Sequence, residues 1–274
     1  MNILKHTIKK FIYGTIPYYF MKGCKPTSPY LKYYRYIKKH GYSRHLYEFK
    51  DEYIHLPVDV RKDEQKGLFY VQRNGKRLYF QKSTPPHKIQ KYYRALMMEQ
   101  DIRSPHHYFN STKEVTGKVF VDVGCAEGYS SLEIIEEAKH VYLFEQNEAW
   151  LEAIKATFEP WQDKITIVQK YVSNHNTAKE LRLDDFFEGK TNEHLFLKMD
   201  IEGAERRALA GCEQLFLNCK KLDFAICTYH LHDDEEVISA FLDKYNCQYT
   251  NQKGFFRHKI RSVVLRGNKA VNNY

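Results

Sequence analysis

The sequence contains no long uninterrupted apolar run. Hydrophobic residues make up 43% of its 274 residues, yet no segment approaches the roughly 18 consecutive apolar residues that a membrane span needs. The apolar stretch 11–21 is short and is interrupted by Pro17. Residues 1–10 are basic, but no hydrophobic core and small-residue cleavage site of a secretory signal follow them. We therefore expect a cytoplasmic protein.

Cysteine pairs with the spacing of a metal or redox site are also absent. None of the six cysteines forms a C-x-x-C pair, and several of them lie inside apolar runs. Free buried thiols are typical of that setting. We expect reduced cysteines without a disulfide framework.

Acidic residues are scarce in the first part of the chain. Residues 1–118 hold 24 Lys and Arg against 9 Asp and Glu, a net charge of +15, whereas residues 119–274 hold 19 against 25, a net charge of −6. Fifteen of the 22 tyrosines also precede residue 119. This balance favours an anionic partner such as a membrane surface, an acidic glycan or nucleic acid. No helix-turn-helix, zinc-finger or RNA-binding signature supports specific nucleic-acid binding.

Two regions follow from these patterns. Residues 1–110 are expected to form a basic, tyrosine-rich α+β extension with helices and a hairpin over 67–81, because Asn74-Gly75 lies between two β-prone runs. The helical stretch at its start places Ile3, Leu4, Ile8, Phe11 and Ile12 on one face. That face could lie on the inner face of a membrane or dock on the protein itself.

Residues 111–274 alternate between expected strands and helices. Such alternation predicts an α/β domain with a mainly parallel, doubly wound, Rossmann-like sheet. Ligands of such sheets bind beyond the carboxyl ends of the strands. The expected strands are 119–123, 141–145, 165–169, 194–199 and 222–228, with a final pair near 247–256 and 261–266, and the helices are 128–138, 147–157, 204–216 and 233–244.

The glycine-rich turn after the first of these strands suits a nucleoside. A β-branched run ends at Asp122, glycines follow at 124 and 128, and the next strand ends on Glu145, which could accept hydrogen bonds from ribose hydroxyls. The third glycine of a dinucleotide loop is missing, and the acid Glu127 would repel a pyrophosphate but suit a cationic ligand. The turn resembles the first motif of class I methyltransferases, which use S-adenosylmethionine. A buried turn with a chance acid is the alternative. The cofactor residues expected here are Asp122, Gly124, Cys125, Glu127, Gly128 and Glu145.

Two further side chains are weaker candidates for the same ligand. His106, in the loop before the first strand, could contact the carboxylate of the methionine part, and Tyr171, after the third strand, could stack on adenine. An ordinary surface loop and ordinary packing explain them equally well.

A second acidic turn carries a more specific resemblance. The run Lys198-Met-Asp-Ile-Glu-Gly-Ala-Glu205, followed by Ala-Leu-x-Gly, closely resembles the signature of FkbM-type methyltransferases, and the acids at 122 and 145 agree in order and spacing. The resemblance covers roughly residues 100–250. It implies an S-adenosylmethionine-dependent O-methyltransferase acting on a hydroxyl of a sugar, glycan precursor or related metabolite.

Methyl transfer to a hydroxyl requires alignment of the acceptor and removal of its proton. Asp200 and Glu202, on one side of a strand-like path, could orient the acceptor, act as base or hold a divalent cation. His230, after the fifth strand, is a natural general base. With His232 and Asp200 it could also complete a metal site, although we expect His232 at the surface. The alternative is that Asp200 caps the next helix, with Glu202 and Glu205 as favourable acids near its N-terminus, and for Glu205 we favour it.

Two other functions remain open at this point. A nucleotide-dependent oxidoreductase would share the ribose-binding acid, but no nicotinamide-side motif accompanies it. A non-catalytic module that binds an anionic surface through the basic half would show salt-dependent binding without turnover.

Overall fold

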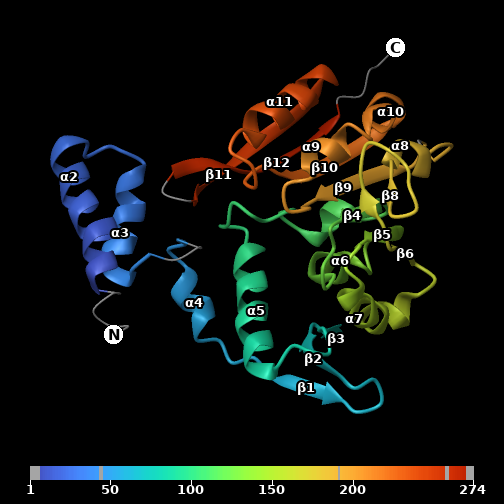
Figure 1. The fold of residues 1–274 in the computed structure, drawn as a ribbon, viewed down its shortest axis with the longest axis horizontal. Coiled ribbons are helices and arrows are strands. Elements are labelled where there is room, and N and C mark those ends of the chain that lie inside the picture. Colours follow the sequence, from blue (N-terminus) through green and yellow to red (C-terminus); the bar gives the residue numbers. More distant parts are fainter. Residues whose placement is uncertain (1–6, 43–45, 191, 257–258, 270–274) are drawn as a thin grey trace. The chain divides into compact units, whose positions relative to one another are not determined.

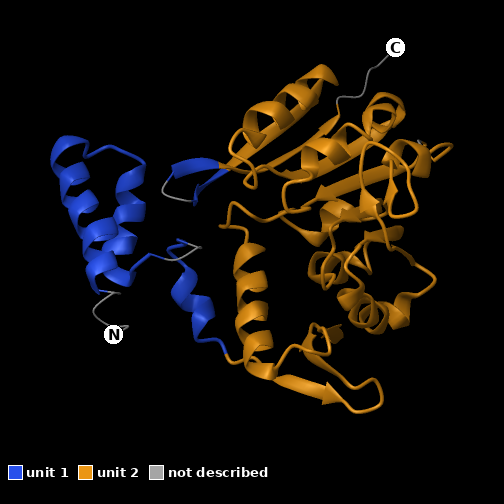
Figure 2. Cartoon of the chain, viewed as in Figure 1, with its two compact units in different colours: residues 1–56, 253–261 blue, residues 57–252, 262–274 orange. Residues whose placement is uncertain are grey.

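The computed structural model describes residues 7–42, 46–190, 192–256 and 259–269. Its helices and strands follow one another as Figure 1 shows. Two units, coloured in Figure 2, comprise residues 1–56 with 253–261, and residues 57–252 with 262–274. Residue 110, where we expected the extension to end, lies within the second unit. Ile3 and Leu4 of the expected amphipathic face lie outside the described residues.

The second unit is built on a seven-stranded sheet in the order β11-β12-β10-β9-β4-β5-β6. Strand β4 is parallel to β5 on one side and to β9 on the other, and β10 continues the parallel part beside β9. Strand β12 runs antiparallel to β10. This mostly parallel sheet confirms the expected Rossmann-like fold. The strands are β4 (Val119–Val123), β5 (His140–Phe144), β6 (Ile165–Val168), β9 (His194–Met199), β10 (Lys221–Cys227), β11 (Cys247–Phe256) and β12 (Lys259–Lys269).

The position of β4 determines where a ligand can bind. All five of its residues are buried, and the strands that follow it in sequence lie on both of its sides. The sheet order therefore changes direction at β4, which makes its carboxyl end the switch point at which open α/β sheets bind ligands.

Most helices of the second unit begin and end close to the expected positions. The helix that begins at Tyr129 ends at Ile134, four residues before the expected end at 138. The expected helix 204–216 is two helices, because Gly211 lies against the backbone of Ser173 and its carbonyl accepts a hydrogen bond from the backbone N–H of Asp184. The helices are α5 (Pro86–Glu99), α6 (Tyr129–Ile134), α7 (Glu148–Phe158), α8 (Leu183–Phe186), α9 (Glu205–Leu209), α10 (Glu213–Asn218) and α11 (Asp234–Lys244), with 3-10 turns at Thr112–Val115 and Glu159–Trp161.

The expected hairpin is present in the same unit. Asn74 and Gly75 adopt φ angles of 49° and 80°, as a tight hairpin turn requires, between β2 (Leu68–Arg73) and β3 (Lys76–Tyr79). A strand that we did not expect, β1 (Val60–Asp63), completes a three-stranded sheet. A short parallel pair, β7 (Tyr171–Val172) and β8 (Glu180–Leu181), was also missed.

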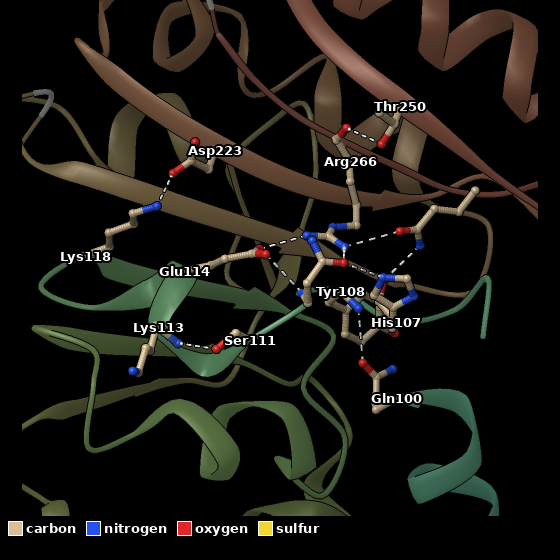
Figure 3. Close-up of polar contacts among 12 residues, drawn as sticks. Gln100, His107, Tyr108, Ser111, Lys113, Glu114, Lys118, Asp223, Thr250 and Arg266 are labelled. Carbon is tan, nitrogen blue, oxygen red and sulfur yellow. Dashed lines mark hydrogen bonds and ion pairs between the residues drawn. The ribbon is translucent and has the colours of Figure 1, made fainter. Parts of the chain in front are cut away.

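The loop between α5 and β4 is tied to the edge of the large sheet (Figure 3). Arg266 in β12 lies 2.8 Å from the carboxylate of Glu114, and Lys118 pairs with Asp223 in β10. At the other end of the loop the backbone N–H of Tyr108 donates to Gln100, 3.2 Å away. These contacts hold the segment that carries Tyr108 against the sheet.

The first unit is helical in its N-terminal part. It contains a π-helical turn (Phe11–Thr15), α2 (Ile16–Cys24), α3 (Tyr30–His40) and α4 (Lys50–Ile54), together with the end of β11 and the beginning of β12. Tyr36, Ile37, Leu46 and Phe255 form its small core. Among the described residues, no helix combines the length and hydrophobicity needed to cross a membrane.

Candidate functional site

The glycines after β4 are required by the protein itself. Gly124 has a φ of +82°, and a Cβ at this position would lie 2.0 Å from the carbonyl oxygen of Asp200. Gly128 has a φ of +83°, and its Cβ would lie 2.6 Å from the ring of Phe158. We expected both glycines in a turn that binds a nucleoside. The structure shows that close packing against β9 and α7 already demands them.

A buried ion pair lies beneath this loop. Asp122, only 1% exposed, has one oxygen 2.8 Å from Lys198 Nζ, and the other accepts a hydrogen bond of 2.6 Å from Ser131. Lys198 also donates to the carbonyl of Gly124 at 2.6 Å. Burial would lower the pKa of Lys198, but the charges of Asp122 and then Asp200 raise it well above its usual value. Asp122 and Lys198 therefore join β4, β9 and the loop.

Glu145, the expected ribose-binding acid, is held by two backbone hydrogen bonds. It follows β5, and its two oxygens accept hydrogen bonds from the backbone N–H groups of Ala126, at 3.0 Å, and Asn147, at 2.7 Å. It is half-buried. Because each carboxylate oxygen can accept more than one hydrogen bond, acceptor capacity remains for a ligand hydroxyl.

The other two side chains of the loop point into the protein. Glu127 is 3% exposed and accepts a hydrogen bond of 2.6 Å from the Tyr92 hydroxyl of α5. Burial raises the pKa of Glu127, although the hydrogen bond from Tyr92 opposes the shift. Cys125 is 5% exposed, and burial raises the pKa of its thiol well above the usual value. The loop thus carries a buried acid but an inert thiol.

Three carboxylates surround His230 next to this loop. Its Nδ1 lies 2.9 Å from Glu205, and its Nε2 lies 3.5 Å from Asp200 and 3.6 Å from Glu202. The His230 side chain is 9% exposed and Glu205 is fully buried, whereas the Glu202 side chain is 84% exposed. The three expected catalytic residues are therefore brought together, with Glu205 added behind the imidazole.

Asp200 is held from several sides. Its Oδ2 accepts a hydrogen bond of 2.7 Å from the Tyr108 hydroxyl, and the Tyr229 hydroxyl lies 3.4 Å from Oδ1. Burial would raise the pKa of Asp200, but the charges of Lys198 and His230 and the Tyr108 hydrogen bond outweigh it and hold the pKa below its usual value. Asp200 is therefore ionised at neutral pH.

The backbone after β9 does not follow the strand-like path that we expected. The strand ends at Met199, and Glu202 has a φ of +54° in a tight turn. Glu205 fixes this turn, because its oxygens accept hydrogen bonds from the backbone N–H groups of Ile201, at 2.9 Å, and Gly203, at 3.0 Å. The turn, rather than strand alternation, brings Glu202 toward His230. Glu205 is an acid in the first turn of α9, as expected, and it also contacts the imidazole.

His230 is tuned by its acidic neighbours. Burial alone would lower its pKa, but the hydrogen bond and charge of Glu205, followed by the charges of Asp200 and Glu202, raise it above the ordinary value of 6.5. The ring therefore binds a proton more readily than an exposed histidine does, because the neighbouring carboxylates stabilise the imidazolium.

A divalent cation would find three donor groups here. One atom each from Asp200, Glu205 and His230 lie within 4.8 Å of one another. The set differs from the two histidines and one acid that we considered, because His232 is exposed. Both Glu205 oxygens already accept backbone hydrogen bonds, which favours an orienting role for this residue over ligation.

His106 and Tyr171, the two weaker cofactor candidates, lie in different surroundings. His106 packs edge-on against Tyr229, with ring centroids 5.1 Å apart, and this places it beside the acidic cluster. Tyr171 is 44% exposed in β7, and its stacking on adenine stays a prediction.

Several residues of the site were missed by sequence reasoning. Lys198 was quoted only as part of a motif, although a lysine inside an apolar strand is itself a signal of a buried ion pair. Tyr92, Tyr108 and Tyr229 hold or flank the acids through contacts between residues 29 to 92 positions apart. No local pattern indicates such contacts.

Comparison with known proteins gives a family and distant structural likenesses. The model of the FkbM methyltransferase domain matches residues 104–249. No curated protein matches the chain. A methyltransferase FkbM structure from Methylobacillus flagellatus has 17% identity and a TM-score of 0.47, covering 67% of this chain and 55% of that one. This chain thus spans about half the length of that protein.

Two other solved structures are more remote still. A Streptococcus mutans protein assigned as a methyltransferase, in complex with SAH, has 11% identity and a TM-score of 0.43, covering 58% of this chain and 93% of that one. A Methanocaldococcus jannaschii tRNA m1G37 methyltransferase has 15% identity and a TM-score of 0.44, covering 83% and 68%.

Proposed function

Because the chain belongs to the FkbM family of S-adenosylmethionine-dependent methyltransferases, we propose that it methylates a hydroxyl group of a sugar, glycan precursor or related metabolite. The observation that carries this proposal is the position of His230. It lies between Glu205 and Asp200 at the carboxyl edge of the sheet, and Asp200 contacts the glycine loop of β4.

The residues around the loop fit S-adenosylmethionine. When bound, this cofactor supplies an electrophilic methyl carbon on a positively charged sulfur. The acids Glu145 and Asp200 lie beside the glycine loop after β4. Glu145 would hold the ribose hydroxyls, and Asp200 would place a negative charge near the sulfonium. Lys198, a cation beside the loop, is 4% exposed and engaged by Asp122. A pyrophosphate would find no accessible partner in it.

His230 is the proposed general base. Because Nδ1 lies 2.9 Å from Glu205, we assign the proton of the neutral ring to Nδ1. The lone pair of Nε2 is then on the side of Asp200 and Glu202. Nε2 would take the proton of the acceptor hydroxyl as the oxygen is methylated. Asp200 and Glu205 would then stabilise the imidazolium.

A hydroxyl-rich acceptor suits the same edge. Asp200 and the exposed Glu202 offer carboxylate oxygens, which accept hydrogen bonds from neighbouring hydroxyls.

We place the reaction in the cytoplasm, which is supported by six free cysteines. No observation supports the oxidoreductase alternative or a purely non-catalytic module.

The test is turnover by wild-type protein and by H230Q, measured as S-adenosylhomocysteine release with a panel of sugar and glycan-precursor acceptors. We expect kcat of H230Q to fall by about 10²–10⁴-fold while cofactor affinity stays unchanged. H232Q is the matched control, because His232 is an exposed histidine of the same loop. Unchanged turnover by H230Q, or methylation only of amino groups, would contradict the proposal.

A further inference from the structure

We propose that the outward face of the N-terminal helical segment, residues 7–24, binds the surface of an anionic phospholipid bilayer. The inference concerns the first unit only and does not depend on the catalytic function proposed above. It commits to a peripheral, interfacial contact and not to a membrane span.

The first observation is an apolar stripe that faces away from the helix partner. Ile8, Ile12 and Ile16 are 48%, 49% and 52% exposed. Their spacing of four residues places them on one helical face. Gly14 is buried, because a Cβ there would lie 2.6 Å from the backbone of Lys38 in α3. The segment therefore packs on α3 by its glycine side and leaves its isoleucines exposed.

Large aromatic residues border the stripe. Phe11 is 55% exposed and Phe20 is 62% exposed. An exposed helix of a globular protein normally turns its polar face outward. Here the exposed side carries isoleucine, phenylalanine and tyrosine, the residue types that insert at the boundary between lipid headgroups and acyl chains.

The second observation is the positive charge of the same unit. Residues 1–47 contain ten Lys and Arg and no Asp or Glu, and residues 253–261 of the same unit add four basic residues without an acid. Lys9 and Lys22 of the segment itself are exposed, as is Lys25 directly after it. Juxtaposed basic residues are each attracted to an anionic membrane surface.

Together the two observations select the bilayer among anionic partners. An acidic glycan or a nucleic acid would use the lysines but would leave the isoleucine stripe exposed to water. A second copy of this chain could cover the stripe, but it would bring like positive charges together. A bilayer with anionic headgroups satisfies the apolar and the basic residues at once.

The experiment is vesicle flotation of the full chain with phosphatidylcholine vesicles that contain or lack phosphatidylglycerol. We expect the wild type to float with the anionic vesicles and to be released as salt is raised. The variant I12S/I16S should bind at least about tenfold more weakly, because two apolar side chains no longer insert. The variant K9Q/K22Q should lose the preference for anionic vesicles.

Matched controls separate this contact from a general loss of apolar surface. I102S/L217S removes two residues of comparable exposure, 61% and 53%, from the second unit, and it should float like wild type. Circular dichroism checks that each variant is folded. Absence of flotation by the wild type, equal binding to neutral vesicles, unchanged binding by I12S/I16S, or self-association in place of flotation would each overturn the proposal.

Discussion

The two units of this chain use charge in opposite ways. The first unit, residues 1–56 with 253–261, has fifteen Lys and Arg against three Asp and Glu, whereas the remainder has 28 against 31. In the first unit lysines such as Lys9 and Lys22 are exposed together with apolar side chains such as Ile12 and Ile16. In the second, charged groups such as Asp122, Lys198 and Glu205 are buried and paired. Burying a charge is costly unless it is paired. The comparison therefore separates a surface that suits binding from a site that suits chemistry.

The largest expected effect is on the free energy of unfolding, and it differs between a buried lysine, Lys198, and an exposed lysine, Lys22. Replacing buried Lys198 by Met removes the cation that pairs with the buried Asp122 and leaves the hydrogen bond from Ser131. We expect K198M to lower the free energy of unfolding by about 3–5 kcal/mol, measured by urea denaturation. K22M, at an exposed lysine of the first unit, should leave it unchanged. Equal effects of the two changes would break the comparison.

A smaller effect is expected on the pH dependence of turnover. Because the pKa of His230 is raised above 6.5, the neutral base accumulates only as pH rises through that higher value, and kcat/KM should rise with it. Glu205 is the main cause of the increase in pKa. E205Q should therefore shift the acidic limb of the profile to lower pH. If the acidic limb of the pH profile is the same in E205Q as in the wild type, Glu205 does not set the pKa of the base.

The raised pKa of His230 also determines how its contribution to stability changes with pH. A histidine with a folded pKa above its unfolded pKa stabilises the fold below the unfolded value, and this contribution is lost as pH rises through the folded value. The wild type should thus lose part of its stability between pH 6.5 and the higher pKa of His230. This loss should be smaller in H230Q, as denaturant titrations at several pH values would show.

The smallest expected effect concerns metal. Glu205 already accepts two backbone hydrogen bonds, so we attribute the cluster to proton transfer. Dialysis against EDTA should leave turnover unchanged within error. Loss of turnover that Mg²⁺ or Mn²⁺ restores would instead make Asp200, Glu205 and His230 a cation site.

Much of the fold could be predicted because its strands are buried on both faces. The apolar runs of β4 and β9 have the bounds that we expected, and Asn74-Gly75 marked the hairpin. The order of the strands and acids likewise placed Asp200 and His230 at one edge of the sheet. These features depend on local hydrophobicity and on general rules of chain connection.

The rest of the site depends on contacts that no local pattern encodes. The left-handed turn at Glu202 follows from hydrogen bonds to Glu205, and the positions of Asp200 and Glu127 depend on tyrosines far away in sequence. The reason for Gly124 likewise appears only when β9 is placed beside β4. Such long-range packing can be read only from the folded chain.

The most direct test of a methyltransferase site on β4 and β5 is calorimetric titration with S-adenosylhomocysteine. We predict binding by the wild type and by E152Q, a change at an exposed acid of α7. E145A should bind at least about tenfold more weakly, because a charged hydrogen-bond acceptor for the ribose is lost. No binding by folded wild-type protein, or equal binding by E145A, would contradict this assignment.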